Sequence, residues 1–408
     1  MKLSRPLLSA ATALVFLVTA CGQPTAPKPD ADLSVQALPQ GRATDLASSG
    51  SGVYAVGVIG IDEDDEYTGT EAFVRKYDRG GNRVWSKRFG TLPNQTGATS
   101  AASDALGNLY VGGYAEEALP GAVGTGGSFL RKYTPSGAVA WTRQGDHPVG
   151  SLATFGKALY AVGSVPNVNA GDAYLRRYDA AGNRIWTRRF GTSGRDVAGD
   201  VAVSDTGFVY VVGSAAGPLA PGSGSGGLFV RKFNPSGGVM WTKQFDLQVP
   251  YFYGMAVAVN GSNVYVLGSH ISSIYEGKSA VYKLNTSGGV VWSKAYTPQS
   301  DGSFAYLEDL NADRTGVYLT GKNYFDTSGG CYGQRVYLGK LRPDGTTAWE
   351  TRLALGTEWS GGVTVLARST NEVYVGGWAD AWMCDDASYG NFYVGRADGA
   401  TGRAVWER

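Results

Sequence analysis

The sequence has few of the residues on which most catalytic and metal sites depend. Its 408 residues include two histidines and three cysteines. His147 and His270 have no metal-ligand spacing around them, and the glycine-rich runs do not form a phosphate loop, a dinucleotide fingerprint or a nucleophile elbow. We therefore expect no metal, no cofactor and no catalytic activity, and we expect both histidines in surface loops.

An excess of charge of one sign is also missing. The chain has 36 Lys and Arg against 35 Asp and Glu, which gives a formal net charge of +1. Without a basic surplus, no long-range field attracts a polyanion. No nucleic-acid partner is expected.

Long hydrophobic runs are absent after the first twenty residues. Lys2 and Arg5 precede an apolar run from Leu7 to Ala20, which is short for a membrane span and typical of a signal peptide. The run ends in Val-Thr-Ala-Cys21, which resembles the lipobox of bacterial lipoproteins and implies acylation of Cys21. Gly22 then favours the outer membrane if the cell has one. The alternative is ordinary secretion with a free Cys21.

These features divide the chain into three parts. We expect a signal peptide over 1–20, a lipidated cysteine with a Pro- and Ala-rich tether over 21–41, and a folded domain over 42–408. The expected protein is a monomer held on the extracytoplasmic side of the cell envelope. It is expected to attach to the membrane through the N-terminal lipid.

What the sequence does have is a repeat. A phrase of the form apolar-Tyr-x-x-Gly, first seen from Val53 to Gly57, occurs seven times. A tryptophan closes each copy, at a spacing of about 50 residues that suits a four-stranded propeller blade. The closing residues are Trp85, Trp141, Trp186, Trp241, Trp292, Trp349 and Trp406.

The repeat predicts an all-β fold, a single seven-bladed β-propeller of four-stranded antiparallel blades. In the fourth copy we expect strands from Asp200 to Ser204, from Val209 to Gly213, from Leu228 to Phe233 and through Trp241. Turns rich in Asn, Pro and Gly separate them, as short hairpins require. The blades are expected at about 42–90, 97–145, 147–190, 196–246, 251–296, 302–354 and 359–408.

Phrases such as Phe73 to Asp78 and Val209 to Gly213 resemble the SBBP family, which is named for its seven-bladed β-propeller repeats. The resemblance covers about residues 42–408 and implies the architecture, not a function. The first copy is complete from Ala43 and the last ends at Arg408. The ring is expected to close by packing of the first and last blades, or by a strand added from Leu33 to Leu38.

Residues that recur at the same position in every blade are expected to stabilise the fold. A ligand site is expected where the residues differ from blade to blade. The closing tryptophans are therefore expected to pack between blades. A basic residue in each third strand is expected at a solvated or salt-bridged edge. These residues are Lys76, Lys132, Arg177, Lys232, Lys283, Lys340 and Arg396.

Three tryptophans fall outside the repeat, all in the last copy, in expected loops that open on one face. Other aromatic and acidic residues gather in the same sector, and such a rim suits sugar rings or a basic peptide. We expect a protein or glycan ligand there. The expected binding residues are Trp359, Trp378, Trp382, Tyr324, Phe325, Tyr332, Tyr251, Tyr253, Asp380 and Asp385.

Cys331 and Cys384 lie in matching loops of adjacent copies. In an oxidising compartment such a pair is expected to form a disulfide that pins the two loops together. Two functions stay open: a binding or scaffold module, and a hydrolase or lyase acting on envelope or environmental glycans. The second would depend on carboxylates such as Asp380 or Asp385.

Overall fold

The structure is a computed structural model of the chain, and its strands are all antiparallel within each blade. It describes residues 41–63, 66–90, 92–145, 148–165, 171–223, 226–245, 253–273, 276–297, 303–326, 332–353, 359–380 and 391–407. In these ranges the regular elements are 28 β-strands, β1 to β28. The predicted all-β class is confirmed.

Each blade is built from four consecutive strands. Blades 1 to 4 comprise β1 (Gly41–Ser48), β2 (Gly52–Glu63), β3 (Glu66–Asp78) and β4 (Arg83–Phe89); β5 (Thr96–Ser103), β6 (Leu109–Ala115), β7 (Gly127–Tyr133) and β8 (Val139–Gly145); β9 (Ser151–Phe155), β10 (Ala158–Val165), β11 (Asp172–Tyr178) and β12 (Arg184–Phe190); and β13 (Val197–Val203), β14 (Val209–Ala215), β15 (Gly227–Phe233) and β16 (Val239–Phe245).

Blades 5 to 7 follow the same order. They comprise β17 (Tyr253–Asn260), β18 (Asn263–Ser273), β19 (Glu276–Asn285) and β20 (Val290–Tyr296); β21 (Phe304–Asp313), β22 (Gly316–Asp326), β23 (Tyr332–Leu341) and β24 (Thr347–Leu353); and β25 (Trp359–Ser369), β26 (Glu372–Asp380), β27 (Asn391–Ala397) and β28 (Ala404–Glu407).

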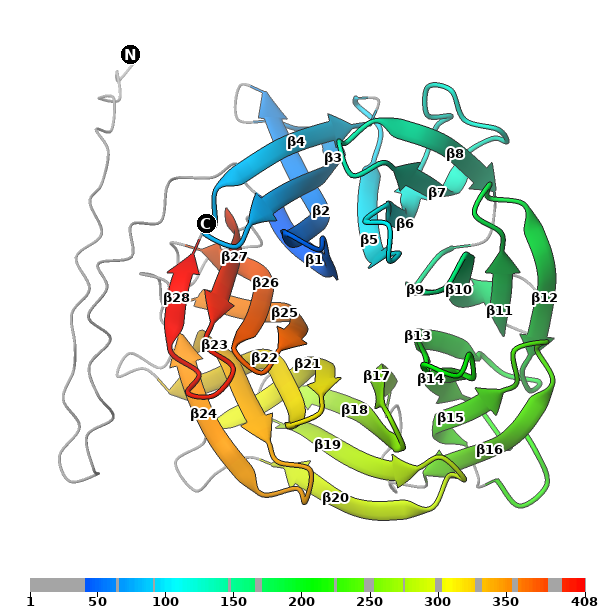
Figure 1. Cartoon of the computed structure of the whole chain (residues 1–408), viewed down its shortest axis with the longest axis vertical. Coiled ribbons are helices and arrows are strands. Elements are labelled where there is room, and N and C mark those ends of the chain that lie inside the picture. The colour runs from blue at the N-terminus through cyan, green and yellow to red at the C-terminus, as the bar shows by residue number, and fades with distance from the viewer. Residues whose placement is uncertain are drawn as a thin grey trace, which may run out of the picture.

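The seven blades surround a central channel, which confirms the predicted seven-bladed propeller. The first strand of each blade lies at the channel and the fourth lies at the perimeter (Figure 1). The short turns between first and second strands and between third and fourth strands share one face, the tight-turn face. The connections between second and third strands and between blades share the other, the long-loop face.

A repeated latch holds neighbouring blades together, and the junction of blades 4 and 5 illustrates it. The Trp241 indole N–H and the Lys232 ammonium donate to the same carbonyl, that of Thr286, at 3.1 and 2.9 Å. Gly288, which has a φ of 85°, follows in that turn, and a Cβ there would lie 3.2 Å from the indole. Glycine is therefore required both for the turn and for the close approach.

The latch recurs at six of the seven junctions between described blades. Across the junction of blades 3 and 4, Trp186 Nε1 has no partner, and Arg188 instead donates to the Gly237 carbonyl at 2.9 Å. The prediction that the closing tryptophans pack between blades is confirmed. The carbonyls that accept from both a tryptophan and a basic residue belong to Pro135, Ala180, Thr286, Pro343, Gly399 and Arg79.

The expectation of a solvated or salt-bridged edge is wrong for three of the basic residues, whereas Arg396 does form an ion pair, with Glu372. Lys76, Lys232 and Lys340 are buried, because their aliphatic stems cross the sheet and their ammonium groups reach the turn of the next blade. The expectation of a surface loop for His270 is also wrong, because this residue lies inside β18 and is buried. His147 lies outside the described residues.

At the junction of blades 7 and 1, called the seam below, the described strands of one blade do not pair with those of the other. Phe73 of blade 1 stacks on Phe392 of blade 7 at 4.5 Å, and the Arg75 guanidinium lies 4.4 Å from the centre of the Phe392 ring. The Trp406 indole donates to the Arg79 carbonyl at 2.9 Å, as in the other latches. The first and last blades pack against each other, as expected, and the segment from Leu33 to Leu38 lies outside the described residues.

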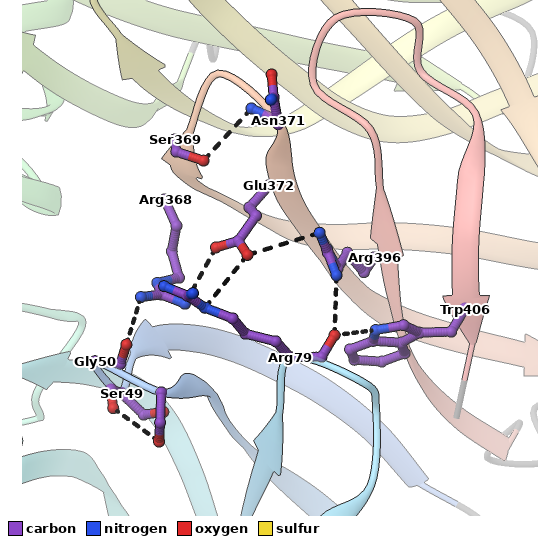
Figure 2. Close-up of polar contacts among 10 residues, drawn as sticks. Ser49, Gly50, Arg79, Arg368, Ser369, Asn371, Glu372, Arg396 and Trp406 are labelled. Carbon is purple, nitrogen blue, oxygen red and sulfur yellow. Dashed lines mark hydrogen bonds and ion pairs between the residues drawn. The ribbon is translucent and has the colours of Figure 1, made fainter.

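The seam also carries a cluster of charges centred on Glu372 (Figure 2). Its carboxylate lies 3.3 Å from Arg79 Nε, 3.2 Å from Arg368 Nη1 and 3.6 Å from Arg396 Nη2. Arg368 Nη2 donates to the Gly50 carbonyl of blade 1 at 2.7 Å. One carboxylate therefore joins three guanidinium groups from the first and last blades.

Candidate functional site

The long-loop face is uneven. The second and third strands are extended to 10–13 residues in blades 1, 5 and 6, compared with 7–8 in blades 2 to 4. The long strands carry their hairpins further from the blade core. The sector that the sequence singled out is therefore the one where the structure departs from sevenfold repetition.

Several predicted site residues lie in strands of blades 5, 6 and 7 and not in loops. Tyr324 and Phe325 belong to β22, Trp378 and Asp380 to β26, and the positions of Tyr332, Trp359 and Tyr253 are at the starts of β23, β25 and β17. In blade 6, for example, the pairing of β22 with β23 continues for several residues beyond Gly321, the glycine of the repeated phrase. Predicted residues that lie outside the described ranges are Cys21, Tyr251, Cys331, Trp382, Cys384 and Asp385.

Blades 6 and 7 are joined at this face into one eight-stranded sheet. Gln334 of β23 pairs in parallel with Trp359 of β25, and the ladder continues from Trp359 to Asp380 in β26. In the other direction Gln334 pairs with Tyr324 in β22. Backbone pairing thus places four residues from two blades, three of them predicted site residues, in one row.

A charged pair beside a tryptophan lies next to this row. Lys322 Nζ of β22 is 2.6 Å from Glu308 Oε1 of β21, and it lies 5.9 Å from the centre of the Trp378 ring across the blade junction. Gly361 allows this approach, because a Cβ there would be 3.0 Å from Trp378 Nε1 and 3.1 Å from Lys322 Cε. Lys322 and Trp378 are therefore in position to bind one ligand together.

Sequence reasoning missed Glu308 and Lys322, although a signal existed. Lys322 follows the glycine of the repeated phrase, and the same position in the other copies has no charge. A search for singular charges at repeated positions would have found it. The equivalent residues are Val58, Tyr114, Ser164, Ser214, Ser269 and Trp378.

Not every aromatic residue of the sector is available to a ligand. Tyr324 is buried and stacks on Phe304 at 4.6 Å. Burial, with a smaller contribution from the Glu308 charge, raises the pKa of Tyr324 to about 12. Phe325 is only partly buried, and Arg335 lies 4.4 Å from its ring centre. Tyr324 therefore stabilises the extended hairpin, whereas Trp378 and Phe325 have exposed surface.

The channel contains a second feature, a belt of polar side chains at one level of the inner strands. Asp45, Asp200 and Asp309 each accept from a backbone N–H of the following blade, at 2.7, 2.7 and 2.8 Å. Hydroxyl groups continue the belt: Leu152 N donates to Ser100 Oγ at 3.0 Å, and Thr364 Oγ1 donates to Asp45 Oδ1 at 3.3 Å. Because the belt recurs around the ring, it is first of all a scaffold.

The belt forms the floor of a cavity of about 340 Å³ on the tight-turn side of the channel. Burial raises the pKa of Asp45 to about 6, against the opposing effect of the Ala101 and Leu46 N–H groups. Burial and the charge of Asp200 hold the pKa of Asp309 well above its ordinary value. Burial therefore favours the protonated form of both carboxyl groups more than water does.

Two searches of the described residues gave negative results. No group of three or more His, Cys, Asp or Glu side chains is placed to hold a metal ion. No helix is long and apolar enough to cross a membrane.

Comparison with known proteins places the repeat in a family. Residues 185–220 match the SBBP family of β-propeller repeats. A 61-residue stretch is 43% identical to the regulatory protein FlaEY of Caulobacter vibrioides, and it covers 15% of this chain and 6% of that protein. The curated relative is thus far longer than the part it shares.

Similar solved structures agree on the fold. Sqt1 of Chaetomium thermophilum, bound to the N-terminus of a ribosomal protein, matches 90% of this chain and 88% of its own with a TM-score of 0.50 at 14% identity. An acylaminoacyl peptidase of Pyrococcus horikoshii matches 90% of this chain and 52% of its own, with a TM-score of 0.50 at 13% identity. At this identity the likeness concerns the fold alone. The chain is a seven-bladed β-propeller protein that carries the SBBP repeat.

Proposed function

We propose that this protein is a lipid-anchored, extracytoplasmic binding or scaffold module whose ligand meets the long-loop face at blades 6 and 7. The observation that carries the proposal is the cluster of Glu308, Lys322 and Trp378, which occupies repeated positions with residues found in no other blade. The Cys21 lipobox supports the anchor.

The direction of the chain is consistent with this role. β1 begins at Gly41 on the long-loop side and runs toward the tight turn after Ser48. A tether ending at residue 40 therefore enters the ring from the face that carries the candidate site. A chain of about 20 residues can span tens of ångströms, so an anchored propeller can still present this face to a ligand in the envelope.

The ligand is expected to be a protein segment or a glycan. Trp378 offers an aromatic surface, while Glu308 accepts and Lys322 donates hydrogen bonds beside it. Because Lys322 neutralises Glu308, the described cluster favours a neutral, hydroxyl-rich or amide-rich ligand over a strongly basic peptide. Sqt1, a propeller of similar shape, is bound to the N-terminus of a protein in its own structure.

The experiment is capture from envelope extracts together with a glycan array, using the soluble form from residue 31 onward. Trp378→Ala and Lys322→Met are expected to lose the captured ligand, because they remove the stacking surface and the donor. Leu106→Ser is the matched control, since Leu106 is 78% exposed on the opposite face. If all variants capture the same material, the site at blades 6 and 7 is wrong.

The anchor has its own test. A full-length chain expressed in a bacterium with the lipoprotein pathway should incorporate radiolabelled palmitate and remain with membranes. Cys21→Ser should do neither. If the wild-type chain incorporates no palmitate, the proposed lipid anchor is wrong, but the proposed binding role is unaffected.

A glycan hydrolase or lyase is the second candidate, and the raised pKa values of Asp45 and Asp309 favour it, since a general acid must hold a proton near neutral pH. A hydrolase screen with Asp309→Asn as the inactive control decides between the two. Turnover that Asp309→Asn abolishes would replace the binding proposal.

A further inference from the structure

The seam has more positive than negative charge. Glu372 is the single carboxylate among Arg79, Arg368 and Arg396 (Figure 2). The side chains of Arg368 and Glu372 are only 11% and 13% exposed, so water screens this excess less than it would at an open surface. In the described residues, Glu372 is therefore the one carboxylate in direct contact with the three guanidinium groups.

The nearest carboxylates along the chain add negative charge nearby, but in the described residues they form no ion pair with the three arginines. Asp78, next to Arg79, accepts from the backbone and side-chain nitrogens of Asn82 at 2.8 and 2.9 Å. These bonds lower the pKa of Asp78 and hold it in its own turn. Asp398 of blade 7 likewise accepts from Thr401 N at 2.9 Å and Thr401 Oγ1 at 2.8 Å.

Several donors in the cluster have no acceptor. Arg79 uses Nε for Glu372, and within the described ranges its two Nη groups make no hydrogen bond or ion pair, although its side chain is 58% exposed. Arg396 Nε and Ser49 Oγ are buried without a partner. An exposed guanidinium fork presented beside two further arginines matches the acceptor geometry of a tetrahedral oxyanion.

We propose that the seam is an anion-binding site that takes a phosphate- or sulfate-like oxyanion. Arg79 of blade 1 supplies the direct, bidentate contact, and Arg368 and Arg396 of blade 7 supply the surrounding positive charge. Because the two sides come from opposite ends of the folded domain, a bound anion stabilises the closed ring. The site lies on the tight-turn face, so this inference is independent of the ligand at blades 6 and 7.

The test is thermal unfolding in sodium phosphate and in sodium chloride at equal pH and ionic strength. Phosphate is expected to raise the Tm of the wild type above its value in chloride, because it binds the folded ring and not the unfolded chain. Arg79→Gln should remove this difference. Arg83→Gln, which changes an exposed arginine of the same blade outside the cluster, should keep it.

Equal Tm values in both salts would overturn the proposal, as would a full phosphate effect in Arg79→Gln. Hydrogen exchange locates the bound anion. Phosphate should protect the turns at 49–51, 79–82 and 369–371, and protection confined to other segments would also overturn the proposal.

Binding to lipid vesicles distinguishes a lipid headgroup from a free anion as the source of the phosphate. Flotation with phosphatidylglycerol but not phosphatidylcholine, lost in Arg79→Gln, identifies a lipid headgroup, and a phosphate shift without flotation identifies a free anion.

Discussion

The seam and the other six blade junctions hold adjacent blades together by different interactions. At each of the six, the polypeptide continues from one blade to the next, and at five of them a tryptophan latch supplements the covalent connection. At the seam the latch through Trp406 is kept, no connection exists, and the Glu372 cluster is added. The ion pairs Arg88–Glu71 and Lys322–Glu308 instead join strands of one blade. In the described residues, the first and last blades are therefore held together by contacts that side chains make, among them bonds to the Gly50 and Arg79 carbonyls.

The largest expected effect is that of Trp406→Ala. Trp406 is buried and packs on Tyr374 and Gly81, so its loss should cost about 3–5 kcal/mol of unfolding free energy. Trp241→Ala, at a junction where the chain continues and the indole is partly exposed, should cost less. Urea unfolding of both variants measures this, and equal losses would mean that the missing connection has no energetic consequence.

The channel belt should make stability depend on pH. The pKa of Asp45 is raised from 3.8 to about 6, so the fold prefers the protonated acid. Its contribution is full below about pH 4 and is lost as the pH rises through 6, an effect of up to about 3 kcal/mol at 1.4 kcal/mol per pKa unit.

Unfolding free energies measured between pH 4 and 8 should therefore fall with pH. Asp45→Asn should flatten that part of the curve, because an amide does not ionise. Asp45 also accepts from Thr364 across the seam, so a comparison with Asp200→Asn shows whether the seam is more sensitive to pH than the junction of blades 4 and 5. A wild-type stability that rises from pH 4 to 7 would contradict the assigned direction.

Glu372→Gln should cost about 1–3 kcal/mol, because it leaves three guanidinium groups, two of them partly buried, without their carboxylate. Glu71→Gln is the matched control. Glu71 is more exposed than Glu372 and pairs only with Arg88, so its loss should cost less than about 1 kcal/mol. Chemical unfolding measures both. A cost for Glu71→Gln that matches that of Glu372→Gln would show that the cluster is no more important than a surface pair.

The smallest expected effect is that of Lys340→Met. This change keeps the buried stem and removes one donor to the Gly399 carbonyl, which still accepts from Trp349. The expected cost is about 0.5–1.5 kcal/mol. Thermal unfolding checks it, with Lys87→Met, at an exposed position of β4, as the control. No difference between the two variants would mean that the tryptophan alone makes the latch.

Much of the fold was predictable because the repeat places Trp, Tyr and Gly at the same positions in every copy. Residues that matter through their partners were harder to find. Lys232 recurs as a basic residue in every blade and was expected at a solvated or salt-bridged edge, but its acceptor is a backbone carbonyl of the next blade. Glu372 stands before the repeated phrase, where the other copies have no charge. It was overlooked because its three arginines are far apart in the sequence, in β25, in β27 and in the turn between β3 and β4.

The candidate site was only partly predictable for a similar reason. Trp378 was found because tryptophans are rare outside the repeat, but Lys322 and Glu308 resemble ordinary surface charges until the ladder brings them together. The prediction placed Tyr324 in a loop. Nothing in its local sequence shows that β22 continues to Asp326 and that its ring stacks on Phe304.

Because each blade is a contiguous set of four strands, the position of the break in the ring is arbitrary. β28 ends and β1 begins on the long-loop face, where short connections such as residues 90–95 join blades elsewhere. A circular permutant that joins these two ends with a linker of that length, and opens the chain between blades 3 and 4 instead, would contain the same seven blades. The seam would then become an ordinary junction, and the one junction without a tryptophan latch would have to hold the ring closed without a covalent connection.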